Sequence, residues 1–216
     1  QRNEIRLAEQ HLTEATRISP EKNLELALLK RDLKRSQEDI QTYAGRAIVA
    51  LTEQLQKDRE DATIRVRLGE ALLVAGQDAQ ARELLVAGLA QKDDPVIRSA
   101  LSNLELMMCD RRLRESPLNR DACLPVVLEA LKRDPSNVNG LMLLTQLKAI
   151  GAEVDATQLT DVIKHWTEKV LSDSDPIPAR LMLSQVKAIC GNLTEAASIL
   201  QPVANVDPKM AIPYAR

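Results

Sequence analysis

The chain has 216 residues, and its 29 Lys and Arg stand against 31 Asp and Glu, so the formal net charge is −2. Hydrophobic residues make up 44% of the chain and charged residues 28%, which is typical of a globular protein and counts against disorder. One Trp, two Tyr and no Phe leave the core to aliphatic side chains, which favours thin layers of packed helices. The near-neutral charge and the scarcity of aromatic residues predict no binding of nucleic acid.

Several kinds of chemistry have no pattern in this sequence. The apolar runs are much shorter than the roughly 18 residues that a membrane span needs, so no membrane insertion is expected. Gly76, Gly151 and Gly191 follow predicted helices rather than strands, which is the wrong context for a phosphate-binding loop. The cysteines and histidines lack the spacing of metal ligands. They are Cys109, Cys123, Cys190, His11 and His165. We therefore expect no catalysis, no metal and no other cofactor.

Prolines preceded by a polar residue recur after amphipathic segments of the chain. Such a proline restricts its predecessor away from the helical conformation and suits the first turn of the next helix. Repetition every 20 to 50 residues, roughly, is typical of helical solenoids. The pairs are Ser19–Pro20, Asp94–Pro95, Asp134–Pro135, Asp175–Pro176 and Asp207–Pro208.

The last interval reads as a helix–turn–helix hairpin. Apolar residues at helical spacing from Ile177 to Ile189 predict a first helix, which Gly191 ends because glycine tolerates a left-handed cap. A second apolar stripe then runs from Ala196 to Ala204. Small residues such as Ala81 and Ala196 are expected to be buried where two helices cross closely.

This hairpin resembles the tetratricopeptide repeat, which has a glycine-containing turn, small residues at the helix crossing and a proline after the second helix. A second copy spans 62–94, where the Leu68–Gly69 pair is the most family-like feature. The matching residues of the last copy are Leu183, Gly191, Ala196, Leu200 and Pro208. Those of the second copy include Leu68, Gly69, Leu72, Gly76, Ala81, Leu85 and Gly88.

The resemblance implies an all-α fold, a right-handed α-solenoid of stacked antiparallel helix hairpins. We expect one array over residues 1–216, which begins with half a repeat and ends with the start of a further helix, as in a segment of a larger protein. Its ends would expose apolar faces and allow end-to-end self-association. The divisions are 1–20, 21–60, 61–94, 95–135, 136–175, 176–208 and 209–216.

Two intervals depart from the family pattern. Residues 21–59 lack the glycine turn, so they form either one long helix or a hairpin broken near Ser36, where Ser36 and Asp39 would make a helix cap. Residues 109–120 are interpreted as a polar insertion between two hairpin helices, with Cys109 at the end of the first helix. Cys190 is expected to end a helix in the same way, and Cys123 to be a core thiol.

In the resembling family, the first helices of the hairpins line a concave surface that binds a peptide or a helix of a partner. Carried over, those positions give an apolar row beside a row rich in amides, which could hydrogen-bond a peptide backbone. The first row is Val66, Ser99, Met142 and Leu181, of which all but Ser99 are apolar, and the polar row is Glu70, Asn103, Gln146 and Gln185. The family's carboxylate clamp uses Lys, Asn and Arg, which Glu70, Gln146 and Gln185 do not match, so no such clamp is expected.

Two basic clusters are alternative contact sites. Lys30, Arg31, Lys34 and Arg35 share one helix face, where they either dock an acidic segment or pair with nearby carboxylates. Arg111, Arg112 and Arg114 lie in the expected insertion, and long insertions in compact arrays are often functional.

The sequence thus predicts a non-enzymatic scaffold whose partner is a protein or peptide. The alternative is a sensing arm that binds a ligand or peptide and regulates an attached effector domain. The sequence leaves the location open: it favours the cytoplasm slightly, and a signal peptide outside this segment would allow a bacterial envelope location.

Overall fold

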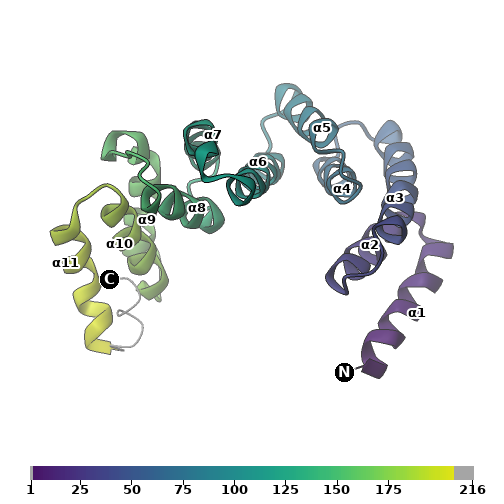
Figure 1. The fold of residues 1–216 in the computed structure, drawn as a ribbon, viewed down its shortest axis with the longest axis horizontal. Helices are drawn as coiled ribbons and strands as arrows, with labels where there is room; N and C mark the ends of the chain where they lie inside the picture. Colours follow the sequence, from purple (N-terminus) through teal and green to yellow (C-terminus); the bar gives the residue numbers. More distant parts are fainter. Residues whose placement is uncertain (1, 207–216) are drawn as a thin grey trace. The chain divides into compact units, whose positions relative to one another are not determined.

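The computed structural model describes residues 2–206, and within them every regular element is a helix (Figure 1). The all-α prediction is therefore confirmed for this part of the chain, with eleven α-helices and no strand. The expected helix at 209–216 lies outside the described residues. The α-helices are α1 (Arg2–Ile18), α2 (Asn23–Asp32), α3 (Gln37–Lys57), α4 (Ala62–Val74), α5 (Asp78–Gln91), α6 (Pro95–Glu115), α7 (Arg120–Arg133), α8 (Val138–Ala149), α9 (Thr160–Ser172), α10 (Ile177–Ile189) and α11 (Leu193–Val206).

The chain divides into two compact units, and the boundary lies inside α6, between Leu101 and Ser102. In the first unit each helix packs on the next in sequence, from α1 to α5. Its core is aliphatic, as the composition predicts, and Ala81 is fully buried. Large core residues of this unit are Leu24, Leu26, Leu51, Leu68, Leu85 and Leu101.

Residues 21–59 form a hairpin rather than one long helix. The side chain of Ser36 accepts a hydrogen bond from the Asp39 backbone at 3.2 Å, which caps the start of α3 as the sequence suggested. The turn has no glycine because Lys34 itself takes the left-handed conformation, with φ of 53°. A side chain costs about 1–2 kcal/mol in that conformation, and here the exposed position of Lys34 avoids further clashes.

The second unit runs from Ser102 through α11, where α7 packs on α8, and α10 packs on both α9 and α11. The contact between α6 and α7 buries an ion pair of Glu105 with Arg133 and a hydrogen bond of 3.1 Å from Ser102 Oγ to the Ala130 carbonyl. α8 approaches α7 closely at Gly140, where a Cβ atom would lie 2.8 Å from Leu131 Cδ2. The two helices can approach this closely because glycine has no Cβ atom.

Three of the turns follow the glycine pattern. Gly76, Gly151 and Gly191 end α4, α8 and α10, with φ of 80°, 91° and 81°. Glycine adopts this conformation without steric cost, so it stops one helix and lets the chain reverse into the next. Ala196 is buried after the last of these turns, as predicted.

The expected insertion at 109–120 is not a loop. α6 continues to Glu115, and a short 3₁₀ helix (Pro117–Asn119) leads into α7. Cys109 therefore lies within α6, not at its end, whereas Cys190 caps α10 as predicted. The interpretation failed because Arg and Glu residues read as a polar loop, although arginine and glutamate are good helix formers.

No helix of the described residues is long and apolar enough to cross a membrane.

Candidate binding groove

An open groove of about 490 Å³ lies between α6 and α8 in the second unit. On α6, residues spaced by four, three and four positions share one helix face and line it. On α8, residues at similar spacing line the opposite side. The lining residues are Asn103, Leu106, Met107, Asp110 and Arg114 of α6, and Asn139, Met142, Leu143 and Gln146 of α8.

The floor of the groove is apolar and its walls are adaptable. Leu106 and Leu143 are 3% and 5% exposed, so they belong to the core beneath it. Met107 and Met142 are about half exposed, at 49% and 54%. An unbranched thioether side chain can adjust its rotamers to different apolar surfaces. The groove therefore offers apolar contact without an aromatic anchor.

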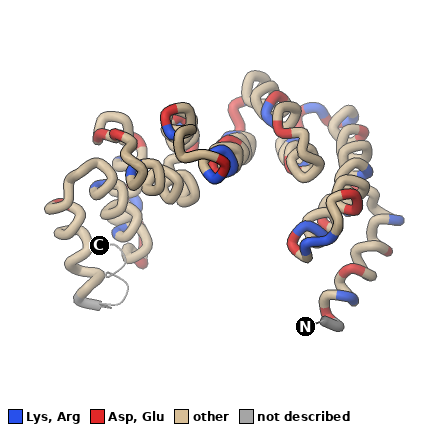
Figure 2. The backbone as a smooth tube through the Cα atoms, viewed as in Figure 1, with Lys and Arg blue, Asp and Glu red and all other residues tan. Residues whose placement is uncertain are grey.

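Amide groups border this apolar strip, and one of them is held in place. Asn137 caps α8 by accepting a hydrogen bond from the Gly140 backbone at 3.0 Å. Its Nδ2 donates to Asn103 Oδ1 at 2.7 Å across the two helices. The Asn103 amide is thereby oriented, and its own NH₂ group remains as a donor. Asn139 and Gln146 are exposed, and α8 carries only one charged residue (tan in Figure 2).

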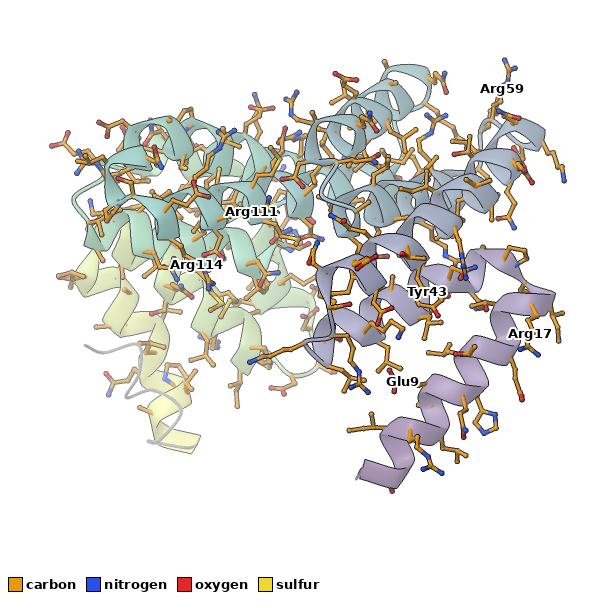
Figure 3. The ribbon with its side chains drawn as sticks, turned by 45° about the vertical axis from the view of Figure 1, so that its right-hand side comes forward. Glu9, Arg17, Tyr43, Arg59, Arg111 and Arg114 are labelled. Atoms are coloured by element: carbon orange, nitrogen blue, oxygen red, sulfur yellow. The ribbon has the colours of Figure 1, made fainter. Side chains whose placement is uncertain are left out.

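One end of the groove is charged. Arg114 Nε donates to Asp110 Oδ2 at 2.9 Å, and Arg114 Nη2 lies 2.8 Å from the same oxygen, one helical turn away on α6. Arg111 and Arg112 are exposed and do not belong to the groove lining (Arg111 and Arg114 are labelled in Figure 3). The arginine cluster and the amide row, two separate candidates in the sequence, thus meet at Arg114.

Asn103, Met142 and Gln146 are the predicted site residues that this groove brings together. Leu181 and Gln185 lie on α10, outside the lining, and Gln185 Nε2 donates to Thr145 Oγ1 of α8 at 2.8 Å. Val66, half-buried, and Glu70, exposed, lie on α4 in the first unit.

The sequence interpretation missed Met107, Asp110 and Asn139. The first two follow Asn103 at spacings of four and three, which is the signal of one helix face. The signal at Asp110 was hidden because the segment from Cys109 onwards was interpreted as a loop.

Comparison with known proteins supports the repeat architecture. Residues 44–104 match the tetratricopeptide repeat family, and this segment includes α4 and α5 with the Leu68–Gly69 pair. This part of the chain is thus similar to a tetratricopeptide repeat. No curated protein matches the chain at a significant level. Tetratricopeptide repeats generally mediate protein–protein interaction.

Three of the four cations of the N-terminal basic cluster, Lys30, Arg31 and Arg35, pair with carboxylates. Lys30 lies 3.5 Å from Asp39 and 4.0 Å from Glu9, and Arg35 donates to Glu9 at 2.9 Å. Lys30 also lies 5.1 Å from the ring centre of Tyr43 (Glu9 and Tyr43 are labelled in Figure 3). These contacts satisfy the cations locally, which favours a solvated, paired surface over a docking site for an acidic segment.

Cys109, Cys190 and His165 could in principle carry chemistry, but each is packed against neighbouring groups. Burial, and the thiol of Cys123 beside it, raise the pKa of Cys109 to about 12. Burial also raises the pKa of Cys190. The rings of His165 and Trp166 meet edge to face at 5.1 Å. Among the described residues, no three His, Cys, Asp or Glu side chains are grouped to hold a metal ion.

Proposed function

We propose that this chain is a non-enzymatic scaffold that binds an extended peptide segment of a partner protein in the groove between α6 and α8. The observation that carries the proposal is the convergence of Asn103, Met142 and Gln146 on one groove with an apolar floor. The tetratricopeptide match supports the general role in protein binding.

The chemistry of the groove favours an extended peptide over a compact ligand. Exposed amides can donate to and accept from a peptide backbone, while alternate side chains of the peptide contact Met107 and Met142. The lining has no Trp or Tyr, and its Arg114 is already paired with Asp110. Because such residues usually supply most of the binding energy, we expect micromolar affinity, about −8 kcal/mol.

The helix bounds support a division of the scaffold into five hairpins. These pair α2 with α3, α4 with α5, α6 with α7, α8 with α9, and α10 with α11. In this division α6 and α8 are the first helices of consecutive hairpins. The groove then lies where two neighbouring repeats meet, so both are needed to form it.

A peptide selected against the full chain tests the proposal. Peptides are enriched from a random phage-displayed library, and the dissociation constant of the best one is measured by fluorescence anisotropy. Met142→Ala and Gln146→Ala should each weaken binding about tenfold, equal to about 1.4 kcal/mol. Leu171→Ala and Gln201→Ala are matched controls at exposed positions on α9 and α11, and they should leave the affinity unchanged.

Charge reversal separates the groove from the arginine cluster. Arg111→Glu and Arg112→Glu lie outside the lining, so the groove proposal expects an effect of less than about threefold from both together, the size of a surface charge contact. Loss of binding in that variant, with normal binding by Met142→Ala and Gln146→Ala, would refute the groove.

A further inference from the structure

Arg65 is a buried cation in the first unit. It lies on α4 and is only 6% exposed, although arginine is almost never buried without a partner charge. Gly88 on α5 makes room for it, since a Cβ atom there would lie 2.4 Å from Arg65 Cδ. The arginine is therefore built into the crossing of α4 and α5.

The hydrogen-bond partners of Arg65 are all neutral. Its Nη2 donates to the Arg59 carbonyl at 2.7 Å and to Gln91 Oε1 at 2.8 Å, and Nη1 donates to the Leu84 carbonyl at 3.4 Å. No carboxylate of the described residues forms an ion pair with it. A guanidinium has five N–H donors, so two remain without a partner in the protein. A buried charge in such surroundings is stabilised by a nearby opposite charge.

Arg65 also lines a cavity of about 350 Å³ with two further cations, Arg59 and Lys92. Both are exposed, and neither forms an ion pair within the part of the chain that the structure describes (Arg59 is labelled in Figure 3). Glu60 and Asp94 line the same cavity. Asp94 is engaged as a cap, because its Oδ1 accepts from the Val96 backbone at 2.8 Å.

We propose that this cavity is a binding site for a single carboxylate group. Three cations against two carboxylates leave one positive charge for an anion to neutralise, and the partly solvated cavity lets the anion reach Arg65, Arg59 and Lys92. A phosphate group carries close to two negative charges near neutral pH, so Glu60 and Asp94 disfavour it. A carboxylate carries one negative charge, which neutralises the single excess positive charge of the lining.

This site is independent of the proposed peptide groove. It is formed by α4 and the turn before it, the end of α5 and the start of α6, and none of its residues lines the groove. The carboxylate has two sources, an acidic side chain of a protein or a free small acid. Both use the same chemistry, and the experiment separates them.

Titration of the full chain followed by NMR tests the site directly. The probes are a blocked tripeptide with a central glutamate, its glutamine counterpart, sodium acetate and inorganic phosphate. The Arg65 Nε–H resonance should shift with the glutamate peptide or with acetate, at millimolar concentration, and not with the glutamine peptide. Tighter binding of the peptide than of acetate assigns the site to protein side chains, and the reverse order assigns it to free acids.

Variants at exposed positions show whether the site acts as an anion site or only as a structural one. Lys92→Gln and Arg59→Gln should each weaken carboxylate binding about two- to fivefold, the size expected of a solvated ion pair. Lys164→Gln, an exposed lysine of α9, is the control and should leave it unchanged. Three results would overturn the proposal: no shift of the Arg65 Nε–H resonance, equal carboxylate affinity in all three variants, or tighter binding of phosphate than of either carboxylate.

Discussion

Arg65 and Gly88 are in direct contact across the crossing of α4 and α5. A Cβ atom on Gly88 would lie 2.4 Å from Arg65 Cδ and 2.9 Å from Nε, closer than real atoms approach. The arginine cannot move aside freely, because its guanidinium is held by the Arg59 carbonyl and the Gln91 side chain. The glycine is thus required by the arginine and not by its backbone conformation.

Gly88→Ala should destabilise the protein by about 1–2 kcal/mol, since the added methyl group displaces Arg65 from its partners. The measurement is the free energy of unfolding in urea. Gly45→Ala is the matched control, because Gly45 lies within α3 and a Cβ there meets nothing within 4 Å. That substitution should stabilise the protein by about 0.5–1 kcal/mol through helix propensity. Equal gains at both positions would show that Arg65 is free to move.

Features encoded locally were predictable from the sequence. Gly76, Gly151 and Gly191 end helices because few other residues adopt a positive φ, and the spacing of the apolar residues indicates the helices on either side. The turn at Lys34 was harder to place, because a non-glycine residue occupies the same conformation there. Ser36 still marks the start of the next helix by its capping chemistry.

Features that depend on contacts between helices were not predictable in this way. The Asn137–Asn103 hydrogen bond joins residues 34 positions apart, and nothing in either local pattern indicates it. Arg65 would be assigned to the surface by residue type. Its burial depends on the space that Gly88 leaves on α5. The groove was half predicted, because α8 was interpreted as a helix while the end of α6 was not.

Ala196→Leu should destabilise the protein by about 1–3 kcal/mol. Ala196 is 5% exposed at the packing of α10 and α11, and a larger side chain there overpacks the crossing. Ala197→Leu places the same side chain on the exposed side of α11 and should change stability by less than about 0.5 kcal/mol. Thermal unfolding of the two variants gives the comparison, and a similar change in both would contradict the assigned helix face.

Iodoacetamide should modify Cys190 before the other two cysteines in the folded protein. Cys190 is half-buried, whereas Cys109 and Cys123 are 1% and 0% exposed. The reactive form is the thiolate, and burial together with Cys123 raises the pKa of Cys109 from its ordinary 9.0 to about 12.

The folded protein therefore keeps the Cys109 proton at pH values where the unfolded chain loses it. Its contribution to stability is complete below pH 9.0 and is lost as the pH rises towards 12.

Mass spectrometry of the alkylated peptides measures this order of reaction. Between pH 7 and 9 the rate at Cys190 should rise as its thiolate fraction grows, while Cys109 and Cys123 remain unmodified. Urea-unfolded protein is the control, and there all three cysteines should react at similar rates. Alkylation of Cys109 as fast as Cys190 in the folded protein would mean that α6 and α7 separate readily in solution, which the buried Glu105–Arg133 ion pair and the Ser102 hydrogen bond oppose.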